Sequence, residues 1–329
     1  MLVDTFLEYP TASTFLASIG SLFVLVQAYN LLKLVAQLTL IKGTNLTKYG
    51  AGKGSWAAIT GSTGDLGIEF ARQMAKKGFN IVLIGRNHDK LEAIGQEIRI
   101  KYKVTTKEVV IDFGNPQPEA FEELKSLASD LEINVLVNCA GLSHEMPVYF
   151  TETSQDEMLG IVDVNIKATL LTTQALLPAM VSRHNGLVLT VGSFSALVPS
   201  AMLATYTGSK AFLERWSQAL GEEVEEFGVD VQLVLPYFVV SAMSKIRRSS
   251  VLIPLASDFV KSTLSSIGLS RGAVSRPFTM TPYWSHALFD WALATFALGG
   301  RFAMGKGLAM HKDIRRRALA KKARLAKSE

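Results

Sequence analysis

Three side chains, Ser193, Tyr206 and Lys210, have types and spacings that suit the reduction of a carbonyl group. Tyr206 and Lys210 are four residues apart, which places both on one face of a helix. An ammonium group beside a phenol favours the phenolate, so we expect the pKa of Tyr206 to fall toward neutral. The phenol could then deliver a proton to a carbonyl oxygen. Ser193 follows an apolar run of strand length, and its hydroxyl can hydrogen-bond the same oxygen.

A glycine-rich segment, residues 60–67, gives this spacing its context, because a Tyr-x-x-x-Lys pair alone is common. The segment follows the apolar run Trp56–Ile59 and opens a helical stretch that ends near Lys77. Glycines let the backbone turn tightly and approach a pyrophosphate, which the helix N-terminus binds through its amides and dipole. The residues that we expect at a dinucleotide cofactor here are Gly61, Thr63, Gly64 and Gly67.

Arg86 indicates which cofactor the site prefers. It follows the second predicted strand, Asn80–Ile84. An NAD site commonly places an acid there for the ribose 2′-hydroxyl, whereas an arginine suits the 2′-phosphate of NADP. We therefore expect NADPH, the alternative being a solvated surface arginine. Asp65 is unfavourable beside a pyrophosphate unless its carboxylate points away.

The elements that would position these residues alternate between apolar strands and amphipathic helices from Trp56 onward. Further runs of strand length are Val109–Ile111, Val135–Val137, Leu187–Val191 and Val231–Leu235. This alternation predicts an α/β fold with a Rossmann-type, doubly wound parallel sheet that helices cover on both faces.

A hydrophobic segment precedes this domain. Phe15–Leu32 is nearly all apolar and is long enough to span a bilayer. A cleaved signal peptide is the alternative, but the chain begins with acidic rather than basic residues, so we expect an uncleaved transmembrane helix. Lys33, Lys42, Lys48 and Lys53 follow the segment and no Lys or Arg precedes it, which predicts a catalytic domain in the cytosol.

The C-terminal region combines an apolar segment with a basic tail. In Tyr283–Gly300, the residues Trp284, Leu288 and Trp291 recur at helical spacing. Residues 301–329 hold ten Lys and Arg against two acids, a net charge of +8. The whole chain has a formal charge of +5, so residues 1–300 carry a net charge of −3. Crossing the membrane would carry this tail away from the cytosol, so an interfacial or re-entrant helix is favoured, with a core helix as the alternative. The tail suggests anionic lipid rather than nucleic acid.

Cysteine content limits the chemistry that the chain can perform. Cys139 is the one cysteine, which excludes a disulfide framework within the chain and a cysteine-based zinc site. We expect no metal at the site.

Together these features resemble a short-chain dehydrogenase/reductase. More narrowly, the chain is similar over almost its whole length to the very-long-chain 3-oxoacyl-CoA reductases of fatty-acid elongation in the endoplasmic reticulum, fungal members above all. The narrower resemblance depends on Glu69–Ala75, Pro236–Val239, Met243–Ser250 and Met280–Trp284.

The resemblance implies a role for each catalytic residue. Ser193 would polarise the substrate carbonyl, Tyr206 would donate the proton, and Lys210 would tune the tyrosine and hold the nicotinamide ribose. Asn165 matches an asparagine that holds a proton-relay water. Further cofactor contacts are implied for Asp112 and Asn138 on the adenine side and for Val239 at the nicotinamide. Ser241 is also implied as a cofactor-binding residue.

Two residues depart from the family pattern. Cys139 replaces a second asparagine, so some stability would be lost. Asp65 stands where the family has glycine, so the glycines instead have the Gly-x-x-Gly-x-x-Gly spacing of other branches.

The expected reaction is NADPH-dependent reduction of a very-long-chain 3-oxoacyl-CoA, at the cytosolic face of the endoplasmic reticulum membrane and beside the elongase, dehydratase and enoyl reductase of elongation. A 17β-hydroxysteroid or other lipid-ketone reductase is the alternative; a catalytically silent membrane scaffold is disfavoured because all three catalytic residues are present. We expect three regions: an anchor over 1–50, a catalytic domain over 51–255, and a membrane-proximal helical segment over 256–329.

Overall fold

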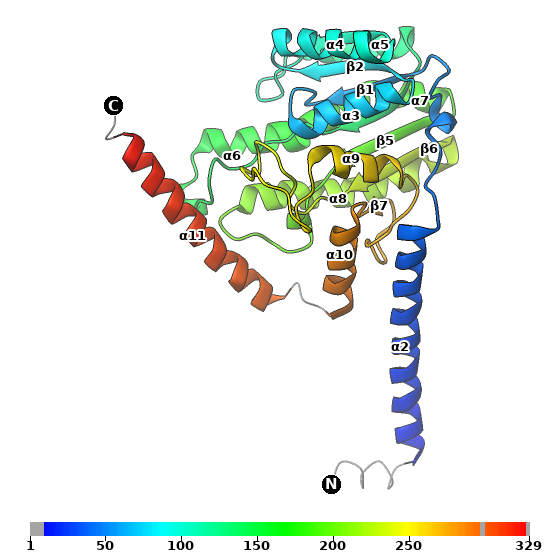
Figure 1. Ribbon diagram of the computed structural model, residues 1–329, viewed down its shortest axis with the longest axis vertical. Helices are drawn as coiled ribbons and strands as arrows, with labels where there is room; N and C mark the ends of the chain where they lie inside the picture. Colours follow the sequence, from blue (N-terminus) through cyan, green and yellow to red (C-terminus); the bar gives the residue numbers. More distant parts are fainter. Residues whose placement is uncertain (1–9, 297–299, 327–329) are drawn as a thin grey trace.

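Parallel strands form the central sheet of the computed structural model, which describes residues 10–296 and 300–326 (Figure 1). In the described part of the chain the sheet has seven strands in the order β3-β2-β1-β4-β5-β6-β7. They are β1 (Trp56–Thr60), β2 (Asn80–Gly85), β3 (Thr106–Val110), β4 (Ile133–Asn138), β5 (Gly186–Val191), β6 (Val229–Val234) and β7 (Thr279–Met280). The order reverses between β1 and β4, and ligands bind at the carboxyl ends of strands at such a point. The predicted fold class is confirmed.

The degree of burial explains how well the bounds of each strand could be predicted from the sequence. Every residue of β4 and β5 is buried, as expected where helices cover both faces of a parallel sheet. The edge strand β3 begins at Thr106 rather than at the predicted Val109, because its first residues are polar and partly exposed and produce no apolar run.

Helices cover the two faces of the sheet in separate layers. On one face lie α3 (Asp65–Lys76), α4 (His88–Tyr102) and α9 (Ala256–Leu264), whose buried side chains include Phe70, Leu91 and Phe259. The other face carries α5 (Pro118–Asp130), α7 (Ala168–Ser182) and α8 (Ala204–Val224). The helix α6 (Gln155–Val162) lies beside α8.

The sheet extends beyond residue 255, where the sequence analysis ended the catalytic domain. Strand β7 pairs with β6, and α9 packs against α3. β7 has two residues, too few to form a recognisable apolar run. Two helices follow, α10 (Trp284–Phe296) and α11 (Arg301–Leu325).

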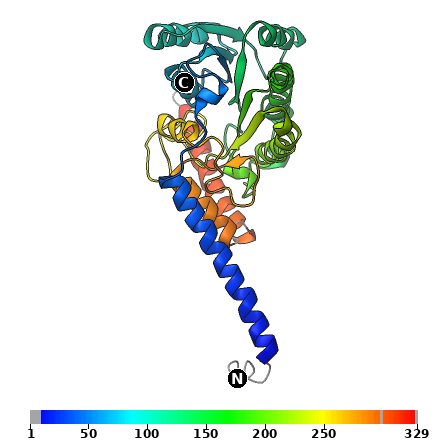
Figure 2. The same ribbon diagram turned by 90° about the vertical axis from the view of Figure 1, so that its right-hand side faces the viewer.

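The N-terminal helix α2 runs from Pro10 to Thr39 and projects from the domain (Figure 2). None of the residues in its most hydrophobic part is buried, and this part is long enough to cross a bilayer. Its last turns are docked: Leu34 is buried, and Gln37 Oε1 accepts a hydrogen bond of 2.6 Å from Arg271 N. The helix is therefore fixed to the domain rather than joined to it by a loose tether.

Candidate active site

The glycine-rich loop has the geometry of a phosphate cradle. Gly61 has φ +67°, and a Cβ there would lie 2.9 Å from Ala140 Cα. A Cβ on Gly67 would lie 2.1 Å from Gly61 O, so only glycine lets α3 start this close to the loop. The N-terminus of α3 thus opens directly onto the loop, as dinucleotide binding requires.

Two residues that the sequence analysis missed hold this loop in place. Ser62 Oγ donates to Ile59 O over 2.6 Å and accepts from Ile84 N over 3.0 Å, which ties the loop to β1 and β2. Thr60 Oγ1 accepts from the amides of Cys139 and Ala140, both over 3.0 Å. The sequence pattern that could have identified them is a small hydroxyl residue on each side of Gly61.

Asp65 lies in the first turn of α3, and its carboxylate is bonded to a loop backbone. Its Oδ2 accepts a hydrogen bond of 2.7 Å from Ala242 N, in the loop that follows β6. The carboxylate therefore joins the first turn of α3 to the loop that also carries Val239 and Ser241.

Arg86 and Asp112 lie at the carboxyl ends of adjacent strands. Gly85 and Val110 are partners in the β2–β3 register. Arg86 directly follows Gly85, and Asp112 lies two residues after Val110. Both side chains are exposed, and Asp112 Oδ1 accepts from Gly114 N over 3.0 Å. This edge can receive the adenosine half of a dinucleotide, with Arg86 free to meet a 2′-phosphate.

The predicted catalytic residues meet at the carboxyl ends of β4 and β5. Ser193 follows β5 and caps a short 3₁₀ turn, Phe194–Ala196. Lys210 is buried on α8; its Nζ donates to Val191 O over 2.9 Å and lies 5.8 Å from the ring centre of Tyr206. The three side chains come together as the sequence predicts.

The predicted fall in the pKa of Tyr206 is wrong for this structure. Burial raises the pKa of Tyr206, and hydrogen bonding with Ser193 lowers it only in part. Lys210 lies over the ring and bonds to a backbone carbonyl rather than to the phenol, and burial lowers its own pKa to about 8. Tyr206 is therefore a neutral phenol at pH 7, the form that can donate a proton.

Asn165 supports the site from a π-helical turn, Asp163–Lys167. Its Nδ2 donates to Leu142 O over 2.9 Å and to Ser209 Oγ over 2.8 Å, while its Oδ1 accepts from Leu142 N over 2.7 Å. The side chain thus joins the β4–α6 loop to α8. Single π-turns are frequent at functional sites because they redirect one side chain.

Asn138 and Cys139 lie beneath the cofactor side. Asn138 Nδ2 donates to Thr173 Oγ1 over 3.0 Å, so its side chain holds β4 to α7. Burial raises the pKa of Cys139 to about 12, which keeps it a neutral thiol.

Val239 and Ser241 lie in the loop after β6. Val239 is buried, and its carbonyl accepts hydrogen bonds from Ser241 Oγ (3.3 Å) and Ser244 Oγ (2.7 Å). The Ser241 hydroxyl is therefore used within the loop turn.

Helix α10 stabilises the segments around Ser193 and Tyr237. Phe289 stacks on Phe194 with ring centres 5.8 Å apart. His286 Nδ1 accepts from Tyr237 N over 3.3 Å, so its Nε2 carries the proton and donates to Leu252 O over 3.0 Å. Burial lowers the pKa of His286 to about 4, which keeps the ring neutral.

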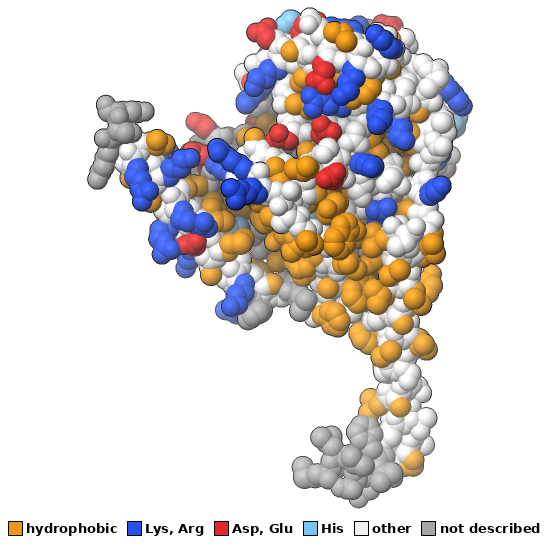
Figure 3. Space-filling model, viewed as in Figure 1, with side chains coloured by type: hydrophobic (Ala, Val, Ile, Leu, Met, Phe, Trp, Pro, Cys, Tyr) orange, Lys and Arg blue, Asp and Glu red, His pale blue; other side chains and the backbone are white. Residues whose placement is uncertain are grey.

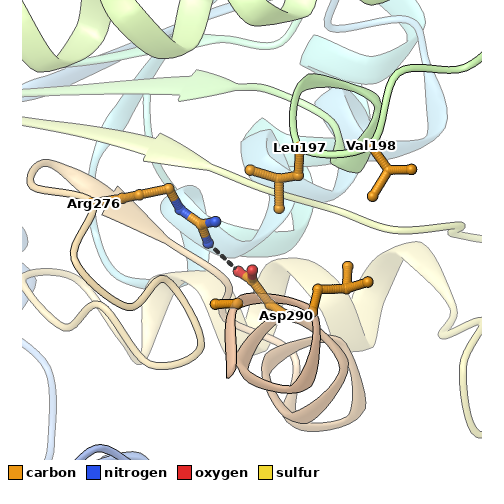
Figure 4. A pocket seen from close by; sticks show the side chains of 6 residues that line it. Leu197, Val198, Arg276 and Asp290 are labelled. Carbon is orange, nitrogen blue, oxygen red and sulfur yellow. Dashed lines mark hydrogen bonds and ion pairs between the residues drawn. The ribbon is translucent and has the colours of Figure 1, made fainter. Parts of the chain in front are cut away.

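A small cavity of about 140 Å³ lies between α10 and the segment after Ser193 (Figure 4). Leu197 and Val198 line one side, and an ion pair between Arg276 and Asp290 lies at the other. Thr281 also donates to Asp290, which is fully buried. The polar face of α10 is therefore directed into the protein.

Comparison with known proteins assigns the fold and site to a class. The family model described as short chain dehydrogenase matches residues 55–251, and the chain belongs to this family. It is 47% identical over 98% of its length to a protein named "Very-long-chain 3-oxoacyl-CoA reductase" from Coprinopsis cinerea, of which the alignment covers 95%. A protein of the same name from Aspergillus oryzae is 46% identical, with 93% of this chain and 89% of that protein aligned.

Solved structures share the fold at lower identity. A 7beta-hydroxysteroid dehydrogenase is 22% identical with a TM-score of 0.65, covering 76% of this chain and 93% of its own. A short-chain dehydrogenase from Sphingobium yanoikuyae, in complex with NADPH, is 22% identical with a TM-score of 0.62, covering 74% of this chain and 94% of its own. The predicted family and oxidoreductase class are confirmed. The roles of individual site residues stay predictions.

Proposed function

We propose that this chain reduces very-long-chain 3-oxoacyl-CoA to 3-hydroxyacyl-CoA with NADPH. The observation that carries the proposal is the near-full-length similarity to reductases of that name, which extends through the anchor and α11 as well as the catalytic domain. The grouping of Ser193, Tyr206 and Lys210 supports it, since a carbonyl reductase needs these three functions.

The chain's own residues would bind the carbonyl and supply the proton. Ser193 Oγ would donate a hydrogen bond to the carbonyl oxygen, and Tyr206 would transfer its phenolic proton to that oxygen. Lys210 would hold the nicotinamide ribose and, as a cation, stabilise the tyrosinate left behind. NADPH supplies the hydride. Arg86 would hold its 2′-phosphate, and the amides of the glycine loop would hold its pyrophosphate.

The remaining site residues would complete the cofactor pocket. Asp112 would contact the adenine, and the backbone at Val239 would contact the nicotinamide amide. Asn138 and Ser241 would act by shaping the pocket walls, since their side chains bond within the protein. Asn165 would order the water that returns a proton toward Tyr206.

A steroid or other lipid ketone is the second candidate substrate. The similarity to a 7beta-hydroxysteroid dehydrogenase is 22% in sequence and concerns the fold alone. The acyl-CoA reductases match more than nine-tenths of this chain, including the membrane-associated parts, so we favour acyl-CoA.

The chain would be held at the endoplasmic reticulum membrane, with α2 spanning it and the catalytic domain in the cytosol. Thr295 near the end of α10 donates to Gln27 of α2 over 3.2 Å. Gln27 lies five residues before Leu32, so the end of α10 would lie about 8 Å inside the predicted span. Trp284, Leu288 and Phe296 form the exposed apolar face of α10. Such a depth is typical of interfacial helices. The other elongation enzymes would be neighbours in this membrane.

A direct assay tests this proposal. The purified protein in detergent should oxidise NADPH with a C18 or longer 3-oxoacyl-CoA and do so far more slowly with a 17-ketosteroid. Equal or faster turnover of the steroid would favour the second candidate. An inactive Tyr206→Phe preparation is the control for contaminating reductases.

A further inference from the structure

Three loops surround the approach to Tyr206, and together we call them the rim: residues 142–152 after β4, 193–203 after β5 and 237–252 after β6. They follow the carboxyl ends of their strands, where substrates of doubly wound sheets enter. Any substrate of this enzyme must pass the rim.

Helix α11 is docked on the rim. His311 Nδ1 lies 2.6 Å from Ala201 O. Arg315 pairs with Glu152, and its guanidinium lies 5.7 Å from the ring centre of Tyr149. The basic C-terminal sequence is therefore a fixed wall of the substrate entrance rather than a free tail.

Basic side chains from α11 and from the third loop converge at Glu145. Lys245 donates to Glu145 O, and Lys322 Nζ lies 4.0 Å from Glu145 Oε2. Arg247 and Arg248 are exposed in the same loop as Lys245 and form no ion pair with any residue that the structure describes. We call Lys245, Arg247, Arg248, Arg315 and Lys322 the rim cluster.

The rim cluster carries an excess of positive charge. Its five cations are accompanied by three carboxylates: those of Glu145 and Glu152, and that of Glu157, which accepts a hydrogen bond from Glu145 N. The side chains of Lys322 and Glu145 are 69% and 71% exposed. Ion pairs this exposed contribute little to stability, so a bound anion could displace Glu145 from Lys322. The basic side chains of α11 gather apart from the hydrophobic surface near α2 and α10 (Figure 3), so a lipid surface against α10 would not engage the whole cluster.

We propose that the rim cluster binds the diphosphate and 3′-phosphate of coenzyme A while the acyl carbonyl lies at Tyr206. This assignment rests on the proposed function, because only a coenzyme A thioester brings these phosphates to the rim. Arginines such as Arg247 and Arg248 bind phosphate oxygens through two parallel N–H groups, and Lys322 would add a point charge. The acyl chain could then extend toward α10 and the membrane.

Equilibrium binding to the full-length protein with NADPH tests the assignment without turnover. S-hexadecyl-CoA and S-hexadecyl-pantetheine share a tail and a thioether, and only the former carries phosphate. The double variant Arg247→Gln, Arg248→Gln should raise the Kd for S-hexadecyl-CoA by roughly fivefold or more and leave that for S-hexadecyl-pantetheine unchanged. Lys322→Gln should have a smaller effect of the same kind, and salt should reduce the advantage of the CoA ligand.

A matched pair of exposed lysines serves as the control. Lys76→Gln with Lys77→Gln removes the same charge at the far end of α3 and should leave both Kd values unchanged. Equal binding of the two thioethers by the wild type, or an equal loss in the control, would overturn the assignment. So would variants that lose binding only to anionic phospholipid vesicles. Normal S-hexadecyl-CoA binding without reduction of any 3-oxoacyl-CoA would instead overturn the proposed function and leave the phosphate site standing.

Discussion

Tyr206 is kept as a neutral phenol by its buried surroundings, and this suits a reductase, because the residue must hold the proton that it transfers. Removing the hydroxyl should therefore abolish proton transfer without disturbing the pocket. We expect Tyr206→Phe to lower kcat by about 10²-fold or more and to change the Kd of NADPH by less than about twofold. NADPH fluorescence titration and steady-state rates measure both. A variant with wild-type turnover would disprove this mechanism.

Lys210 should determine the alkaline limb of the pH profile. Burial lowers its pKa to about 8, so it is a cation below that pH and loses its charge as the pH rises through it. Because the pKa of Tyr206 is raised, the tyrosine keeps its proton over the same range. We expect kcat/KM to fall above pH of about 8. In Lys210→Arg the side chain stays charged, so the decrease in kcat/KM should occur at a higher pH. A decrease at an unchanged pH would mean that another group causes it.

Arg86 should set the preference between the two nicotinamide cofactors. Arg86→Asp would repel the 2′-phosphate of NADPH and could bind the 2′-hydroxyl of NADH. The ratio of kcat/KM for NADPH to that for NADH should fall by about tenfold or more. Lys107→Asp, a charge reversal at an exposed position in β3, is the control. Equal use of both cofactors by the wild type would contradict the role of Arg86.

Among the elements, α10 depends on a buried ion pair for its position. Asp290 is fully buried against Arg276 and Thr281, so Asp290→Ala would leave a largely buried cation with the more distant Glu214, 4.0 Å from Arg276 Nε, as its charged partner. We expect the free energy of unfolding to fall by about 3 kcal/mol. Asp313→Ala removes a carboxylate whose partners Arg316 and Arg317 are mostly exposed, and should cost less than about 1 kcal/mol. Denaturant unfolding in detergent compares the two, and equal losses would contradict the argument.

The π-turn at Asn165 and the contact of Asp65 with Ala242 show how elements distant in sequence share one site. Each side chain bonds to a loop backbone more than twenty residues away. No local pattern reveals such partners, because they depend on how the layers pack.

For the whole molecule, we expect α2 to be the transmembrane element of the described chain, and α10 to enter the interface without crossing. The flanking lysines and the basic C-terminal region both favour a cytosolic domain. When the protein carries a C-terminal tag and is embedded in sealed microsomes, added protease should digest the tag without detergent. A tag that survives until detergent is added would place the C-terminus in the lumen, and the charge argument would fail.

The sequence by itself determined the class of fold and predicted a cofactor loop and a catalytic trio, because these are local patterns. Glycines at a strand–helix turn, apolar runs, and a Tyr–Lys pair one helical turn apart are set by backbone geometry alone. It also predicted the long apolar helix α2, because hydrophobic length is a local property.

The tertiary structure alone decided the protonation state of Tyr206, the orientation of Asp65 and the fate of the basic tail. Burial and hydrogen-bond partners come from residues far apart in the chain, so a pKa predicted from sequence neighbours had the wrong sign. The same reason applies to α11: its charges, counted along the sequence, suggest a basic tail suited to anionic lipid. Only the tertiary structure shows that the helix packs against Ala201 and Glu152.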